Sequence, residues 1–231
     1  MAGILLLMHP LIERSGALQG YTAFELVMIC LAGSDFTPFA ALLCVIPFAS
    51  SFCKDDQSGI SSYIEERTGI RKYAFSRTLV VALSGGVLMA LIMAALFLAS
   101  SLLAGQCDTV ETASIFQYSM WWRIGAVQMW NGLPMYLGKC LSAFLFGAVW
   151  ALWGLAISIV FPNKYIAAVI PFSIYQLQWY FFRKYPFNPV LLLRGEDSRI
   201  PSLYYIVEVQ GSWILLLASL SIFGIMKKTR R

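Results

Sequence analysis

Long apolar runs limit what this chain can fold into more than any other feature of its sequence. Residues 78–105 contain no charged side chain, and an α-helix needs about 20 apolar residues to cross the ~30 Å hydrocarbon core of a bilayer. Only 13% of the 231 residues are charged, and 59% are hydrophobic. Soluble domains average about 25% charged residues. The sequence therefore predicts an integral membrane protein with several helices.

Five runs are predicted as clear membrane spans. They are residues 36–53, 78–105, 140–162, 165–182 and about 210–226. We expect a kink at Pro47 in the first span and a break at Pro171 in the fourth, because proline removes a helical hydrogen bond. The predicted fold class is all-α, a polytopic membrane helix bundle that forms a single transmembrane domain over residues 1–231.

Small residues mark where the predicted spans should pack closely. Ser84, Gly85 and Gly86 lie together in the second span. In the third span, Gly147 and Gly154 are spaced for contact with another helix. Side chains of this size let two helix backbones approach each other within a membrane. We therefore expect these positions at helix–helix contacts.

Two shorter apolar runs precede the first span. Residues 1–9 are too short to cross a bilayer, and residues 17–34 are interrupted by Glu25. We expect the second run to be a re-entrant or interfacial helix. Five spans would leave the N-terminus outside, so either residues 17–34 do span, or the chain continues a longer protein; we favour the latter. The N-terminal apolar segment is thus short or degenerate.

Two segments are predicted on the outer side. Residues 106–138 have the aromatic and polar composition of a membrane interface. Residues 183–209 contain two short apolar pieces around a charged turn, Arg194 to Arg199. Neither piece is long enough to span, so we expect two re-entrant or interfacial helices, covered by other helices that satisfy their backbones.

The distribution of Lys and Arg predicts the orientation. If residues 54–77 face the cytoplasm, ten of the 17 basic residues lie inside and seven lie outside, in longer loops. Cytoplasmic segments of membrane proteins are enriched in Lys and Arg. We therefore expect a multi-pass protein of the cell membrane with its C-terminus in the cytoplasm. The small net charge of +5 reflects this topology rather than binding to nucleic acid.

Several classes of chemistry lack their residues. No predicted span carries an ionisable side chain well inside it, which disfavours proton-coupled transport. The chain has no phosphate-binding loop, G-x-S-x-G or H-E-x-x-H motif, no C-x-x-C pair, and only one histidine, His9. We expect no enzymatic activity, cofactor or metal. Gln176 and Gln178 are interpreted first as interhelical hydrogen-bonding groups, and second as contacts along a substrate pathway.

The hydrophilic segment 54–77 separates the first two predicted spans and carries nine charged residues. We predict a short helix at about residues 58–68, with a capping box formed by Ser62 and Glu65 and a left-handed C-terminal residue at Gly69. One face of this helix would hold the residues at positions i, i+3, i+4 and i+7, which are Ile60, Tyr63, Ile64 and Arg67. That face packs either on the chain's own helices or lipid headgroups, or on a partner.

The same segment resembles the cytoplasmic loop of type 2 ABC exporter permeases, the membrane subunits that pair with a separate ATPase. The start of the family pattern is matched by Asp55, Asp56 and Gly59, and its end by Arg71, Tyr73 and Arg77. Three positions depart from it: Ile60 replaces the usual Thr, Gly69–Ile70 replaces a Pro-containing pair, and Arg77 replaces Lys. The order of the later spans also resembles the family.

The resemblance implies a function. The predicted helix would couple to an ABC ATPase subunit that hydrolyses ATP, and two permease chains within the lipid membrane would line one export pathway. The coupling residues implied are Asp55, Asp56, Gly59, Ile60, Tyr63, Ile64, Glu65, Arg67, Arg71, Tyr73 and Arg77. The alternative is a non-transporting membrane anchor, such as an immunity or sensor component that binds a partner protein.

Overall fold

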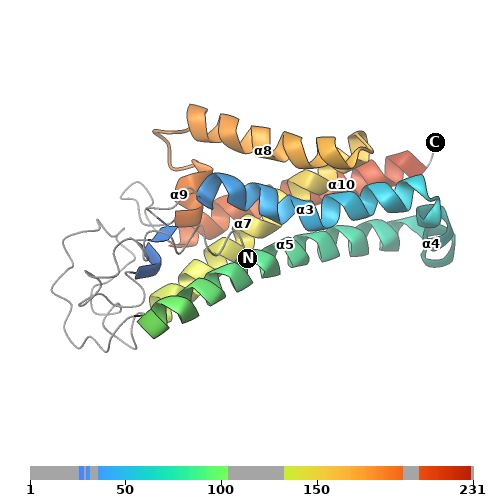
Figure 1. Ribbon diagram of the computed structural model, residues 1–231. Coiled ribbons are helices and arrows are strands. Elements are labelled where there is room, and N and C mark those ends of the chain that lie inside the picture. Colours follow the sequence, from blue (N-terminus) through green and yellow to red (C-terminus); the bar gives the residue numbers. More distant parts are fainter. Residues whose placement is uncertain (1–25, 29, 32–35, 104–132, 195–202, 230–231) are drawn as a thin grey trace.

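The computed structural model describes residues 26–28, 30–31, 36–103, 133–194 and 203–229 (Figure 1). All secondary structure in these residues is helical, which confirms the predicted all-α class for this part of the chain. The helices are α3 (Phe36–Gln57), α4 (Ile60–Thr68), α5 (Ile70–Leu103), α7 (Leu133–Val160), α8 (Lys164–Phe181), α9 (Pro189–Arg194) and α10 (Leu203–Thr229). The predictions for residues 1–25 and 104–132 lie outside the described residues.

Helix α7 forms the centre of the bundle. It packs against α3, α5, α8, α9 and α10, and every residue from 146 to 152 is buried. Its side chains join two apolar cores. One core contains Phe36 of α3 and Trp150 of α7; the other contains Phe52 of α3 and Leu152 of α7. An apolar helix buried on nearly all sides is the expected axis of a membrane bundle.

Three helices are long and apolar enough to cross a membrane. These stretches are Ile70–Leu102 in α5, Tyr136–Val160 in α7 and Leu203–Lys228 in α10. Large apolar side chains also point outward, for example Leu98 of α5, which is 65% exposed, and Leu215 of α10, which is 74% exposed. Apolar surface on this scale would be unfavourable in water and matches a lipid environment. The chain is therefore a membrane protein.

The prediction of five clear spans is not confirmed. The other two predicted spans, residues 36–53 and 165–182, do form the helices α3 and α8, which lie alongside the bundle (Figure 1). Helix α8 has only 18 residues, and it includes Lys164 and two glutamines. Whether α3 and α8 cross the membrane stays a prediction.

Several predicted boundaries are wrong. Helix α7 begins at Leu133 rather than at residue 140, so Lys139 lies within a membrane-spanning helix instead of an outer loop. It is only 1% exposed, and its Nζ contacts the Sδ atom of Met28. Helix α10 begins at Leu203, so the second outer apolar piece continues α10 rather than forming a separate re-entrant helix. The described part of the first piece is the short helix α9.

Neither proline ends its helix. Helix α3 runs from Phe36 to Gln57 through Pro47, and α8 continues through Pro171, so the predicted break is wrong. Pro171 is buried within the bundle. Proline in a membrane helix is tolerated where neighbouring helices and local adjustments satisfy the freed backbone group.

The predicted close contacts of small residues are confirmed. A Cβ atom built on Gly85 of α5 would lie 2.6 Å from the carbonyl oxygen of Gly147 of α7. A Cβ atom on Gly154 of α7 would lie 2.6 Å from Cγ1 of Val45 in α3. The glycines therefore bring one face of α7 into direct contact with α5 and, two turns further along, with α3.

Candidate functional site

The bundle has two distinct ends. Helix α4, the turn between α7 and α8, and the last turn of α10 lie at one end, whereas α9 lies at the other (Figure 1). At the α4 end, the side-chain Nε2 of Gln57 donates a hydrogen bond to the carbonyl oxygen of Pro162 at 3.1 Å. Seven described basic residues belong to elements at this end: Arg67, Arg71, Lys72, Arg77, Lys164, Lys227 and Lys228. Four described basic residues belong to the α9 end: Lys139, Arg183, Lys184 and Arg194.

Two glycines separate α4 from its neighbours. Gly59 has a φ of 70° and Gly69 a φ of 81°, which confirms the predicted left-handed residue at the end of α4. In both cases a Cβ atom would meet nothing within 4 Å, so the backbone angle alone favours glycine. The predicted capping box is wrong, because α4 begins at Ile60 and Ser62 therefore lies inside the helix rather than capping it.

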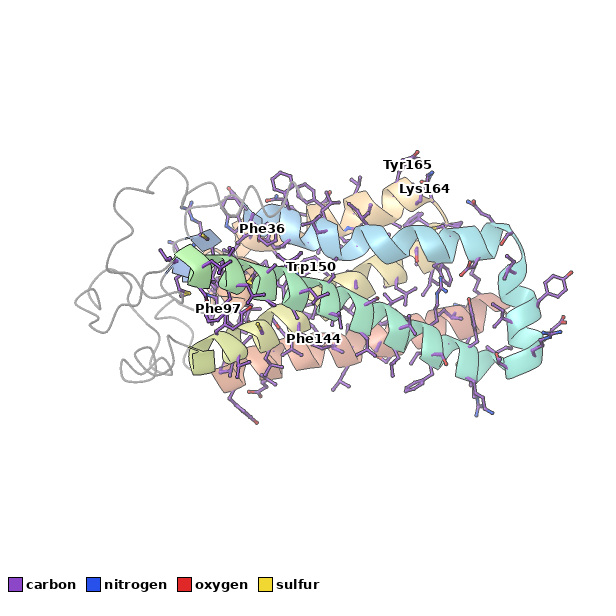
Figure 2. All side chains as sticks on the ribbon, turned by 60° about the horizontal axis from the view of Figure 1, so that its bottom comes forward. Phe36, Phe97, Phe144, Trp150, Lys164 and Tyr165 are labelled. Carbon is purple, nitrogen blue, oxygen red and sulfur yellow. The ribbon has the colours of Figure 1, made fainter. Side chains whose placement is uncertain are left out.

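The apolar face of α4 is uncovered. Ile60 is 51% exposed, Tyr63 is 71% exposed and Ile64 is 39% exposed, and Arg67 on the same face is also exposed. Among the described residues no helix covers this face, so its packing on lipid headgroups or on a partner stays a prediction. Figure 2 shows a second exposed group near this end, Lys164 and Tyr165 at the start of α8, pointing away from the bundle.

Charged residues next to α4 connect α3, α5 and α10. Arg77 Nη2 of α5 lies 2.9 Å from the carboxylate of Asp55 in α3. The Arg77 guanidinium is also 5.9 Å from the ring centre of Phe52, and Lys228 Nζ of α10 is 5.6 Å from the same ring. Cations over an aromatic ring are attracted to its face. Tyr73 is buried in the core beside Phe52.

The predicted coupling residues are thus only partly brought together. Asp55 and Arg77 form an ion pair between α3 and α5, the two helices that α4 connects. Tyr73 is buried in the core of the same region. Gly59 shapes the entry to α4, while Arg71 is exposed at the start of α5. The side chains of Asp56 and Glu65 lie outside the described part of the chain.

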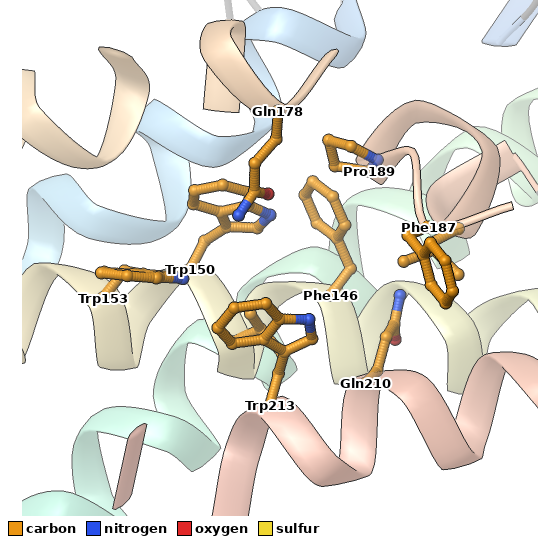
Figure 3. A pocket seen from close by; sticks show the side chains of 10 residues that line it. Phe146, Trp150, Trp153, Gln178, Phe187, Pro189, Gln210 and Trp213 are labelled. Carbon is orange, nitrogen blue, oxygen red and sulfur yellow. The ribbon is translucent and has the colours of Figure 1, made fainter. Parts of the chain in front are cut away.

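A slot lined by aromatic rings lies between α7, α8, α9 and α10 (Figure 3). The rings of Trp153 and Trp213 form part of its wall, with their centres 6.0 Å apart. Gln178 of α8 and Gln210 of α10 enter from opposite sides (Figure 3). The remaining lining residues are Phe146, Val149, Trp150, Phe187, Pro189 and Leu192. Of the two glutamines predicted on α8, Gln178 lines the slot and Gln176 does not.

Gln210 is the functional candidate that sequence reasoning missed. It is 2% exposed, and among the described residues neither its Nε2 nor its Oε1 atom has a hydrogen-bond partner. Buried polar groups in proteins are nearly always paired. The available signal was an amide within an apolar run, but we placed the start of the last span at that residue. The slot that it lines is completed by residues of α7, α8 and α9.

A second hollow lies on the surface between α5, α7 and α10. Its volume is about 260 Å³, and its lining includes Phe75 and Leu79 of α5, Phe144 of α7 and Ile222 of α10. Its one hydroxyl, on Thr78, donates a hydrogen bond to the carbonyl oxygen of Ala74. This hollow therefore offers a ligand only apolar contact, unlike the aromatic slot.

Within the described residues, no cluster of three or more His, Cys, Asp or Glu side chains could hold a metal ion. Comparison with known protein families, curated proteins and solved structures finds no match for this chain.

Proposed function

We propose that this chain is the transmembrane subunit of an ATP-driven exporter of the type 2 ABC class, and that α4 docks on a separate ATPase subunit. One observation carries the proposal. A short helix stands at the basic end of a membrane bundle, between two left-handed glycines, with the apolar side chains of Ile60, Tyr63 and Ile64 exposed. A soluble partner that buries this face would gain apolar contact area.

The order of elements supports the same class. Helices α3, α4 and α5 follow one another as a span, a coupling helix and a span do in the family. The short helix α9 stands before the last long helix, α10, as short outer helices do there. Two of the residues that carry the resemblance, Asp55 and Arg77, form an ion pair.

The proposed mechanism uses these contacts. Closure of two ATPase subunits around ATP pushes α4, which is joined directly to α3 and α5. The Asp55–Arg77 ion pair and the Phe52 ring, which lies near Lys228 of α10, pass the displacement to three helices at once. Two copies of the chain then rearrange to open one pathway across the cell membrane. The C-terminus, at the same end as α4, is cytoplasmic in this proposal.

Removal of the α4 face tests the proposal. The chain is co-expressed with the ABC ATPase subunit that the proposal requires, sought first among the genes beside its own, and capture of the ATPase is measured by affinity purification. We expect the double variant Tyr63→Ala, Ile64→Ala to weaken capture by about tenfold or more, because buried aromatic anchors dominate interface energetics. The melting temperature should stay unchanged, since both side chains are exposed.

Tyr165→Ala is the matched control, because Tyr165 is an equally exposed aromatic residue (69%) near the same end but outside α4. Equal capture by the α4 variant and the wild type would contradict the docking proposal. Normal capture without ATP-dependent transport into vesicles would instead favour a non-transporting membrane anchor.

A further inference from the structure

The side-chain amide of Gln210 suggests that the aromatic slot binds a ligand. Both polar atoms of a carboxamide that is 2% exposed lack partners among the described residues. An apolar side chain of the same shape would avoid the cost of desolvating the amide. A polar group that enters the slot would repay that cost.

The free space limits what can enter. The room available to a water-sized group is about 20 Å³, and a cavity needs roughly 10–15 Å³ by this measure to hold one water. The slot is also partly open to the surface. In this conformation it therefore admits one small polar group, either a water molecule or the polar end of a larger molecule that remains outside.

The walls select the chemistry of that molecule. None of the ten lining residues is ionisable, so a charged group would lose its hydration without gaining a counter-ion. Gln178 and Gln210 each offer an N–H donor and a carbonyl acceptor, which complements an uncharged amide. The rings of Trp150, Trp153 and Trp213 add aromatic carbon surface around it.

We propose that this slot binds an uncharged, apolar molecule through an amide group, which Gln210 and Gln178 hold by hydrogen bonds between the tryptophan rings. A hydrophobic peptide with a neutral end has this chemistry. The inference names a substrate class for the proposed exporter and to that extent rests on the proposed function, but the binding step itself needs neither ATP nor a partner.

Tryptophan fluorescence can detect the binding, because three of the seven tryptophans in the chain line the slot. The full chain in lipid nanodiscs is titrated with N-acetyl-leucyl-leucinamide. Two matched probes replace the terminal amide, one with a methyl ester and the other with a free carboxylate. We expect a saturable change with the amide, and about tenfold weaker binding of each matched probe, because each keeps its two internal amides but lacks the N–H donors of the terminal amide.

The variant Gln210→Leu separates a binding role from a structural one. We expect it to bind the amide probe about tenfold more weakly while melting no lower than the wild type, since it removes an unpaired polar group. Gln176→Leu is the control, because Gln176 lies on α8 but not on the slot. It should bind the amide probe normally.

Equal binding of the amide and ester probes, unchanged binding by Gln210→Leu, or no saturable signal would each overturn the proposal and leave a slot that holds only water. These outcomes are independent of ATPase capture by α4. Failure at the slot with normal capture leaves the exporter proposal standing. Loss of capture with normal amide binding leaves the slot standing.

Discussion

Arg77 and Asp55 are 22 residues apart in sequence, yet the guanidinium of one lies 2.9 Å from the carboxylate of the other. The pair closes the base of the hairpin made by α3, α4 and α5. Helix α4 itself is joined to α3 and α5 through Gly59 and Gly69. The pair links α3 to α5. The buried ring of Phe52 in α3 lies near both Arg77 of α5 and Lys228 of α10, and so connects the pair to the core.

The Asp55–Arg77 pair should make a measurable but modest contribution to stability. The two side chains are 30% and 20% exposed, so solvent screens part of their attraction. A double-mutant cycle with Asp55→Asn and Arg77→Gln, followed by thermal or denaturant unfolding in detergent, should give a coupling free energy of about 0.5–1 kcal/mol. The coupling should shrink as salt is added. Strictly additive effects of the two substitutions would show that the pair contributes nothing.

The glycine before α4 gives a test in which Gly→Ala at two positions, Gly59 and Gly211, should change the free energy of unfolding in opposite directions. Gly59→Ala should lower the free energy of unfolding by about 1 kcal/mol, because its φ of 70° is unfavourable for a residue with a Cβ atom. Gly59→Asn should cost less, since asparagine tolerates this region. Gly211→Ala in α10, where a Cβ atom also meets nothing within 4 Å, should instead be stabilising by about 0.5–1 kcal/mol. Equal effects at Gly59 and Gly211 would contradict this reading.

The contact between α5 and α7 predicts a graded series of glycine substitutions. Gly85→Ala should destabilise by about 1–3 kcal/mol or more, because its Cβ would lie 2.6 Å from a backbone oxygen of Gly147, which cannot move aside. Gly86→Ala should cost less, since the obstacle is the Phe144 ring at 2.7 Å, which can rotate. Gly224→Ala, at 3.2 Å from Ile159 Cγ2, should be nearly neutral. Melting temperatures in one detergent would rank the three variants, and a reversed order would refute the packing argument.

Cysteine labelling tests the orientation of the bundle. Cys30, Cys44 and Cys53 are buried and Cys140 is half-buried, so these thiols should react slowly; Cys107 is replaced by serine to remove its reactivity. In this background Tyr63→Cys should react with an impermeant maleimide only from the cytoplasmic side. Lys184→Cys, an exposed position at the α9 end, should react only from outside. Labelling of Tyr63→Cys from outside would reverse the topology and remove the support for docking of an ATPase.

Local sequence signals predicted the parts of the fold that depend on local physics. Uninterrupted apolar runs predicted the long helices, and Gly69 predicted the end of α4 because a left-handed residue interrupts a helix whatever surrounds it. The predicted start at about residue 58 was too early, because Gly59 is also left-handed and α4 begins at Ile60. The boundaries that failed were drawn at charges and polar residues. Lys139 was assigned to a loop because a lone lysine is costly in a membrane, yet it lies in α7 against Met28.

The candidate slot could not be predicted from local patterns. Gln178 is conspicuous in the sequence because it interrupts an apolar run. Gln210 is conspicuous only in the folded chain, where it lines the slot with residues of α7, α8 and α9. Periodicity along one helix reports which residues share a face, and not which distant element covers that face. The orphaned state of the Gln210 amide therefore became visible only in the assembled bundle.

The glycine contact between α5 and α7 has a mechanical consequence. The backbones of Gly85 and Gly147 touch at this contact, and the side chains of Ala151 and Met89 lie beside it. A displacement of α5 at this level would therefore be passed to α7 rather than absorbed by a gap between the helices. Phe146, next to Gly147 in the sequence, forms part of the slot wall. Any such displacement would reach the slot through the residue beside Gly147.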